Sequence, residues 1–170
     1  MKIQAVFLYL LTLYKVSQLF GTIGVSVIIY KIRHMKQIII TKQDSTRIHK
    51  SIMDAKKNNS IKAEDAERLL RELHSAKIVE SADIPADVVT MNSVVKIHFE
   101  NNKTVTEFKI VYPEQANIKD RKISIFSPVA AALIGYSVND EIDWIVPSGM
   151  TKIIIDEIIY QPEAAGDFDL

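Results

Sequence analysis

One short stretch, from Ser127 to Gly135, constrains the fold more than any other part of the chain. It reads SPVAAALIG and carries a start and a stop for a helix. Ser127 can cap the first free amides, Pro128 suits the first helical position because no N–H is needed there, and Gly135 can adopt the left-handed conformation that ends a helix. Ala131, Leu133 and their neighbours are apolar. The stretch therefore predicts a short helix that is buried against a sheet.

Alternating apolar residues predict that sheet. A period of two is typical of a strand with one buried face. The pattern predicts about five strands, at residues 95–99, 108–112, 122–126, 141–147 and 151–160. An antiparallel sheet with one buried helix places the chain in the α+β class.

The same pattern predicts the core and the irregular segments. The inward-facing apolar residues of the strands and the helix are Val95, Ile97, Phe99, Phe108, Ile110, Val129, Leu133, Trp144, Ile153 and Ile155. Residues 82–92 contain Pro85 and are expected to form a linker. Residues 163–170 are small and acidic, and we expect an exposed tail there.

Residues 35–81 are predicted to form a short antiparallel helical hairpin, which is a small coiled coil. A polar turn at residues 58–60 separates two segments whose apolar residues recur with helical spacing. Thr41 or Asp44 can cap the first helix, and Ser60 can cap the second.

The tip of this hairpin is predicted to bind a partner. It is basic, because lysines flank two asparagines. The residues that we expect to make contact are Lys56, Lys57, Asn58, Asn59, Lys62, Glu64 and Asp65. Glu64 and Asp65 would lie in the first turn of the second helix, where the helix dipole favours acidic side chains without any metal ion.

Composition excludes several kinds of chemistry. The chain has no cysteine, and its four histidines are scattered without the spacing of a metal site. Its five glycines form no phosphate-binding loop. Residues 79–170 hold seven basic and fifteen acidic residues, a net charge of −8, which argues against an independent nucleic-acid-binding domain. We expect no catalytic residue, cofactor, metal ion or small-molecule substrate.

Residues 1–34 leave two interpretations open. They are mostly apolar but are interrupted by Lys15. One interpretation is a membrane anchor, with Lys31, Arg33 and Lys36 on the cytoplasmic side. The other is that the true start is Met35 and that the segment before it has no function. Both interpretations place the rest of the chain, from Met35 onward, in the cytoplasm.

Three blocks of the sequence resemble the Gre family of bacterial transcription factors. The signature residues around the short helix are Ser127, Pro128, Ala131, Leu133, Gly135 and Asp140. The blocks PADVVTMNS (residues 85–93) and YQPEAAGD (residues 160–167) resemble the Rnk branch of that family, the regulators of nucleoside diphosphate kinase. The order of elements is similar from Met35 onward. The resemblance implies an FKBP-like C-terminal domain over residues 82–170.

The resemblance also implies RNA polymerase as the partner. In Gre factors the coiled coil enters the secondary channel of the polymerase, and acidic tip residues help to hold a catalytic Mg²⁺. Here the predicted helices reach only about 21–24 Å, at 1.5 Å per residue, and the tip is basic. We therefore expect a monomeric, non-enzymatic regulator that binds polymerase near the secondary channel and competes with Gre factors. It would modulate elongation, with at most indirect contact with nucleic acid.

Two alternatives stay open beside this hypothesis. The first is an active stimulator of transcript cleavage that uses Glu64, Asp65 or Glu67 with Mg²⁺. The second is a peptidyl-prolyl isomerase, which the implied FKBP-like fold suggests. Its aromatic pocket would use Phe126, Tyr136 and Trp144, although aromatic residues at such positions more often belong to the core.

Overall fold

The computed structural model describes residues 37–146 and 149–168, which lie within one compact unit, Gln37–Leu170. Both interpretations of residues 1–34 concern a segment outside the described residues. Within the two described ranges, no helix combines the length and the apolar character that a membrane crossing requires.

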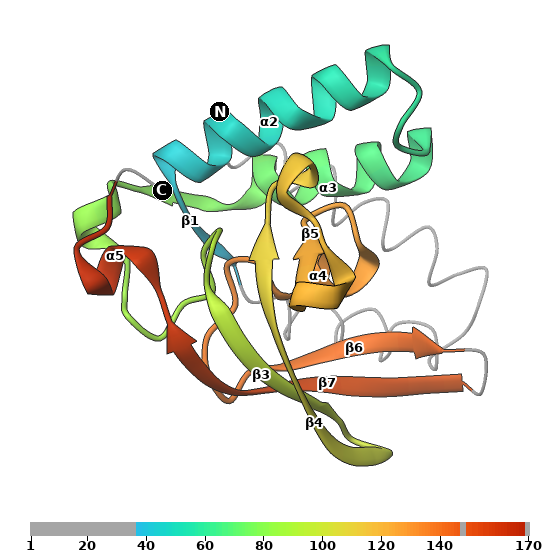
Figure 1. Cartoon of the computed structure of the whole chain (residues 1–170), viewed down its shortest axis with the longest axis vertical. Helices are drawn as coiled ribbons and strands as arrows, with labels where there is room; N and C mark the ends of the chain where they lie inside the picture. The colour runs from blue at the N-terminus through green and yellow to red at the C-terminus, as the bar shows by residue number, and fades with distance from the viewer. Residues whose placement is uncertain (1–36, 147–148, 169–170) are drawn as a thin grey trace, which may run out of the picture. The chain divides into compact units, whose positions relative to one another are not determined.

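The first part of this unit is a pair of helices. Helix α2 (Lys42–Lys57) is followed after a short turn by α3 (Ala63–Ser75), which runs back beside it (Figure 1). Strand β1 (Ile39–Thr41) leads into the pair and β2 (Lys77–Val79) leads out of it. These strands are parallel neighbours, with Ile39 opposite Lys77, so α3 returns the chain to the start of β1.

The apolar stripes of the two helices meet as their spacing predicts. Ile48 and Ile52 of α2 are fully buried, as is Ala66 of α3. Leu69 and Leu73 continue the stripe of α3, one turn apart. Burial of these side chains, rather than helix propensity, is the main stabilisation of helices this short.

The two predicted helix caps had different outcomes. Thr41 does cap α2, since its Oγ1 accepts a hydrogen bond of 3.0 Å from the Asp44 N–H. The prediction for Ser60 was wrong, because α3 begins after Lys62 and has no side-chain cap. The Ser60 N–H instead donates to the carbonyl oxygen of Ala55 over 2.9 Å. Ser60 therefore belongs to the turn that follows α2. It lies two residues before the N-cap position of α3, Lys62, and so cannot cap that helix.

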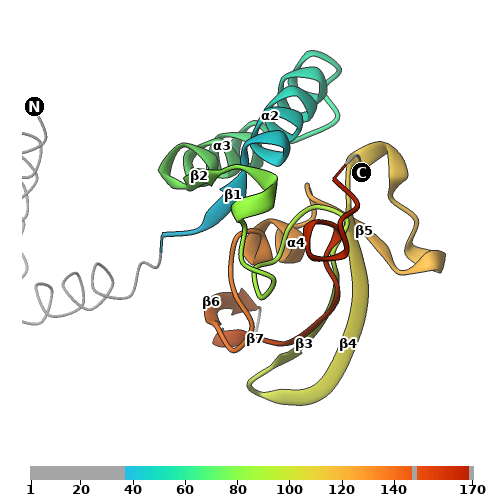
Figure 2. The same cartoon turned by 90° about the vertical axis from the view of Figure 1, so that its left-hand side faces the viewer.

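The second part is a five-stranded sheet. Its strands are β3 (Val94–Phe99), β4 (Asn102–Val111), β5 (Lys122–Ser124), β6 (Glu141–Val146) and β7 (Gly149–Tyr160). Their order across the sheet is β5-β4-β3-β7-β6. Figure 2 shows the helical pair toward one end of this unit and the hairpin of β3 and β4 toward the other. The α+β class is confirmed.

The expectation of a wholly antiparallel sheet was wrong at one strand. β5 is parallel to β4, with Lys109 opposite Lys122. The connection between these strands contains two short 3₁₀ turns, η2 (Pro113–Gln115) and η3 (Ile118–Asp120). It carries the chain back as far as Lys109, so β5 runs in the same direction as the last residues of β4.

The core lies between the sheet and the helices, and includes α4 (Pro128–Leu133). Most of the predicted core is buried: Val95, Ile97, Phe108, Ile110, Leu133, Ile153 and Ile155. Phe99 and Val129 are half-buried and pack against these residues. The side chain of Trp144 lies outside what the structure describes.

The expectations for the linker and the tail held only in part. Residues 84–92 form no helix or strand, but side chains such as Val88 and Met91 are buried, and residues 164–168 are exposed although part of a short helix lies there. After β7 the chain forms a short helix, α5 (Pro162–Ala165). Gln161 is buried, and its Nε2 donates to the carbonyl oxygens of Pro85 at 2.9 Å and Val88 at 2.6 Å. Only a tertiary contact could reveal this, since the partners are more than seventy residues apart in sequence.

Candidate functional site

The turn between α2 and α3 presents the lysines at one end of the helical pair. Asn58 ends α2 with its N–H bonded to the carbonyl oxygens of Asp54 and Lys56. Asn59 has a φ of 54°, a left-handed conformation that asparagine tolerates better than most residues. These contacts shape the turn, and Lys57 and Lys62 are exposed beside it.

The acidic residues near the tip are largely engaged by neighbouring cations. Glu67 accepts a hydrogen bond of 2.7 Å from Lys56 Nζ, and this bond is the main reason that the pKa of Glu67 is lowered. Asp65 lies 3.5 Å from Arg68, one turn further along α3. Glu64 is exposed. Within the described part of the chain, no three His, Asp or Glu side chains are grouped so that they could hold a metal ion.

Helix α4 begins at the predicted cap. Ser127 Oγ accepts a hydrogen bond of 3.3 Å from the Ala130 N–H, and Pro128 occupies the first turn. Ala130 and Leu133 are fully buried. Pro128 is exposed at the beginning of the helix. The predicted roles of Ser127 and Pro128 in starting the helix are confirmed.

Gly135 follows α4 at a place where only glycine fits. Its φ is +79°, and a Cβ atom there would lie 2.8 Å from Ile38 Cβ and 2.9 Å from the Ile39 carbonyl oxygen. The Ile39 N–H donates to the Gly135 carbonyl oxygen over 3.1 Å, and the Gly135 N–H donates to that of Val89 over 2.9 Å. The predicted left-handed glycine therefore also joins the base of the helical pair to the sheet part.

Asp140 closes the turn that leads into β6. Its Oδ2 accepts a hydrogen bond of 2.7 Å from the Ser137 N–H, and its own N–H donates to the Ser137 carbonyl oxygen over 3.0 Å. Asn139, just before it, has a φ of 67°. The signature residues thus shape α4 and the turn beyond it.

A buried carboxylate, which the sequence suggested only as an alternative helix cap, links α2 to the sheet part. Asp44 is 4% exposed. Its two carboxylate oxygens accept hydrogen bonds from the Met91 N–H and the Tyr112 hydroxyl, each 3.0 Å long. Arg47, one turn along α2, acts on Tyr112 in the direction that lowers the pKa of Tyr112.

The electrostatics of this junction follow from its burial. Burial is the main cause that raises the pKa of Asp44 to about 6, and the negative charge of Glu163 adds to the effect. The hydrogen bond from the Met91 N–H acts in the opposite direction. Burial and the neighbouring charge of Asp44 likewise raise the pKa of Tyr112.

Glu163 of α5 closes a second polar contact beside this junction. Its Oε2 accepts a hydrogen bond of 2.8 Å from Thr90 Oγ1. The Thr90 N–H donates to Ser93 Oγ over 3.1 Å, and both residues are buried. Helix α5 is thereby fastened to the segment that precedes β3.

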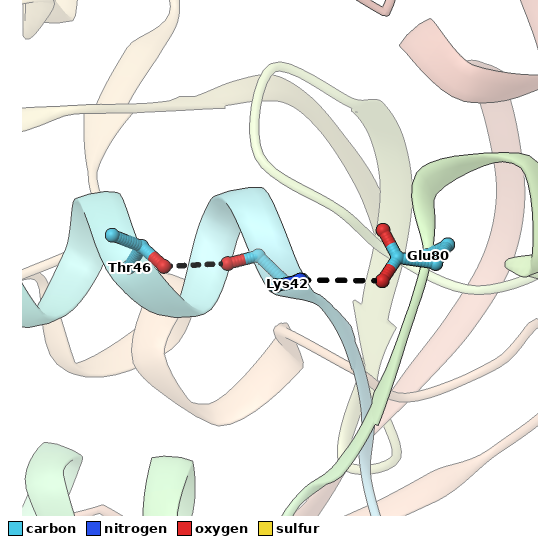
Figure 3. A network of polar contacts seen from close by, with 3 residues as sticks. All are labelled: Lys42, Thr46 and Glu80. Atoms are coloured by element: carbon cyan, nitrogen blue, oxygen red, sulfur yellow. Dashed lines mark hydrogen bonds and ion pairs between the residues drawn. The ribbon is translucent and has the colours of Figure 1, made fainter.

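The base of the helical pair carries an exposed polar contact (Figure 3). Lys42 Nζ lies 3.5 Å from Glu80 Oε1, and Thr46 Oγ1 donates to the Lys42 carbonyl oxygen over 2.8 Å. A shallow pocket of about 350 Å³ lies here, between α2 and the residues that follow β2. Exposed ion pairs of this type contribute little to stability.

The three aromatic residues considered for an isomerase are placed as follows. Phe126 is half-buried beside α4 and lines a groove that faces α2. Tyr136 is half-buried directly after Gly135, and burial raises its pKa. The side chain of Trp144 lies outside the described residues, so an aromatic pocket made by all three stays untested.

Comparisons with known proteins agree on one kind of relative. The family model "Transcription elongation factor, GreA/GreB, C-term" matches residues 84–160. The chain is 40% identical over 104 residues to the regulator of nucleoside diphosphate kinase of Escherichia coli (strain K12), a match that covers 61% of this chain and 76% of that protein. It is 38% identical over 86 residues to transcription elongation factor GreA of Clostridium novyi (strain NT), covering 51% of this chain and 54% of GreA.

A solved structure supports the same relationship. A prokaryotic transcription elongation factor GreA/GreB from Nitrosomonas europaea is 33% identical in sequence and superposes with a TM-score of 0.60. The match covers 73% of this chain and all of that one. The likeness therefore includes the arrangement of the elements as well as the signature blocks.

Proposed function

The chain belongs to the GreA/GreB family of transcription elongation factors, and on that premise we propose that it is a non-enzymatic regulator that binds RNA polymerase near the secondary channel. It competes there with Gre factors and modulates elongation. In this proposal residues 82–170 form the domain that docks on the polymerase, and residues 35–81 enter the mouth of the channel. The protein acts in the cytoplasm as a monomer.

The chemistry of the tip is the observation that carries this proposal. Lys57 and Lys62 are exposed there, whereas Asp65 and Glu67 are paired with cations. Holding Mg²⁺ for cleavage requires free carboxylate oxygens. An arrangement in which two of the three candidate acids already have partners supports binding without catalysis.

The length of the helices supports the same proposal. α2 has 16 residues and α3 has 13. At 1.5 Å per residue they extend about 24 Å and about 20 Å. Such a pair occupies the entrance of a channel more readily than it reaches a distant catalytic centre.

Binding is tested with the purified full-length chain and core RNA polymerase, with GreA added as competitor. We expect saturable binding that GreA displaces. Binding that GreA leaves unchanged would contradict the proposed location, and no binding at micromolar concentrations would contradict the proposed partner.

Catalysis is tested separately on a backtracked elongation complex. We expect that the chain releases no short RNA 3′ fragments and that it slows the cleavage stimulated by GreA. Fragment release by the chain alone, abolished by Glu64→Gln, would instead identify an active cleavage factor.

A further inference from the structure

A groove of about 1110 Å³ lies between the helical pair and one edge of the sheet. One wall is α2 with the turn that follows it, and the other is made by β4, β5 and η2. Its volume is slightly above the range of about 300–1,000 Å³ that is typical of sites that bind small molecules. It borders the tip, because Asn58 and Ser60 line it, but the exposed lysines Lys57 and Lys62 do not.

The groove is lined by more cations than anions. Arg47 and Lys50 come from α2, Lys109 from β4 and Lys122 from β5. Two acidic residues, Asp54 and Glu114, also line it. Asp54 lies 3.9 Å from Lys57, so part of its charge is balanced outside the groove.

Three of these cations have no carboxylate partner among the described residues. Lys50, Lys109 and Lys122 form no ion pair there, and Lys109 instead lies over the ring of Tyr160, with 5.8 Å between its Nζ and the ring centroid. Lys109 and Lys122 are half-buried. A partly buried ammonium group without a counter-ion is unfavourable, and an anion placed between these side chains would relieve that cost.

The remaining lining suits a ligand that is not only an anion. Phe126 and Pro113 supply an apolar surface, and Asn58, Ser51 and Gln115 supply hydrogen-bonding groups. A molecule with phosphate groups at one end and a ring system at the other matches both kinds of surface.

Part of the strand edge within the groove is already paired, at Lys122, which disfavours an extended acidic peptide. The Lys122 N–H donates to the Asn117 carbonyl oxygen over 2.9 Å, and the Asn117 N–H donates to that of Lys122 over 3.0 Å. An added strand requires free backbone groups along an edge. A compact ligand requires only the side chains.

We propose that this groove binds a small phosphorylated molecule of nucleotide size, with its phosphate groups held by Lys50, Lys109 and Lys122 from opposite walls. The site goes beyond the proposed binding to polymerase and does not depend on it. Because one wall is α2 and the other is the sheet part, a ligand here bridges the two parts of the molecule.

The test is calorimetric titration of the full-length chain with ATP, ADP and inorganic tripolyphosphate. We expect all three to bind, and ATP and ADP to bind more tightly than tripolyphosphate because they also use the apolar surface. The variant Lys50→Gln with Lys122→Gln should bind ATP at least about tenfold more weakly, since it loses two charged contacts.

A matched control carries Lys77→Gln and Lys119→Gln, which remove the same charge from exposed lysines that do not line the groove. It should bind ATP like the unchanged chain, and both variants should unfold at the same temperature as that chain. Equal weakening in both variants, or absence of binding by all three probes at millimolar concentration, would overturn the proposal. Preference for a single-stranded RNA oligonucleotide or a polyglutamate peptide over ATP would also overturn it.

Discussion

Tyr112 donates a hydrogen bond of 3.0 Å from its hydroxyl group to Asp44 Oδ1, and so ties the end of β4 to the first turn of α2. Sixty-eight positions separate the two residues in sequence. With the bond from the Met91 N–H to the other carboxylate oxygen, this contact connects the helical pair to the sheet part through one side chain.

Removing this carboxylate should destabilise the fold. Asp44→Ala leaves the Met91 N–H buried without its acceptor and removes the acceptor of the Tyr112 hydroxyl, and we expect a loss of about 3 kcal/mol in the free energy of unfolding. Tyr112→Phe removes one bond and should cost about 1 kcal/mol. Urea denaturation measures both values. A loss below about 0.5 kcal/mol for Asp44→Ala would show that the junction is held by apolar packing alone.

The same carboxylate should make stability depend on pH. Its pKa is raised from 3.8 to about 6 in the folded chain, so the folded state binds a proton more tightly than the unfolded state. The associated stabilisation is fully present below pH 3.8 and is lost as pH rises through about 6.

This pH effect can be isolated by comparison with Asp44→Asn, which cannot titrate. Between pH 7 and pH 4 the unchanged chain should gain about 2–3 kcal/mol in unfolding free energy relative to the variant. Denaturation series at several pH values measure the difference. A difference that stays constant, or that shrinks as the pH falls, would contradict a raised pKa for Asp44.

Gly135 and Gly166 form a matched pair for testing close packing. Both have positive φ angles, +79° and +82°, but an added Cβ meets Ile38 and Ile39 only at Gly135. Gly135→Ala should therefore cost about 3 kcal/mol or more, from backbone strain and steric overlap together. Gly166→Ala should cost about 1 kcal/mol, from the backbone alone. Equal losses in thermal denaturation would mean that β1 moves away without penalty.

Charge at the tip should control binding to polymerase. Lys62→Glu reverses one exposed charge at the turn, and we expect affinity for core RNA polymerase to fall by about threefold to tenfold, mostly through slower association. Lys77→Glu makes the same change on the exposed strand β2 at the base of the helical pair. The control should bind like the unchanged chain. If both variants bind alike, the tip does not make the contact.

Local interactions explain which features the sequence predicted well. Ser127 caps α4 through an amide three residues away, and Thr41 caps α2 in the same manner. The alternation from Val95 to Phe99 predicts a strand because successive side chains point to opposite faces. Each of these signals lies within a few residues, so no knowledge of the fold is required.

Features that depend on distant partners escaped prediction. The acidic segment after β7 resembled a free tail, but Glu163 is held by Thr90, 73 positions earlier. Asp44 was expected only as an alternative to Thr41 for capping the first helix. Nothing near it in sequence indicates that Met91 and Tyr112 surround its carboxylate.

The sequence by itself determined the α+β class, the helix caps at Thr41 and Ser127, most of the core and the family signature, since each rests on short-range spacing. Only the tertiary structure decided the parallel pairing of β5, the burial of Asp44 and the groove lined by Lys50, Lys109 and Lys122. These features arise where segments far apart in the chain meet. Burial there removes water, so a pKa or a charge balance depends on partners that no local pattern encodes.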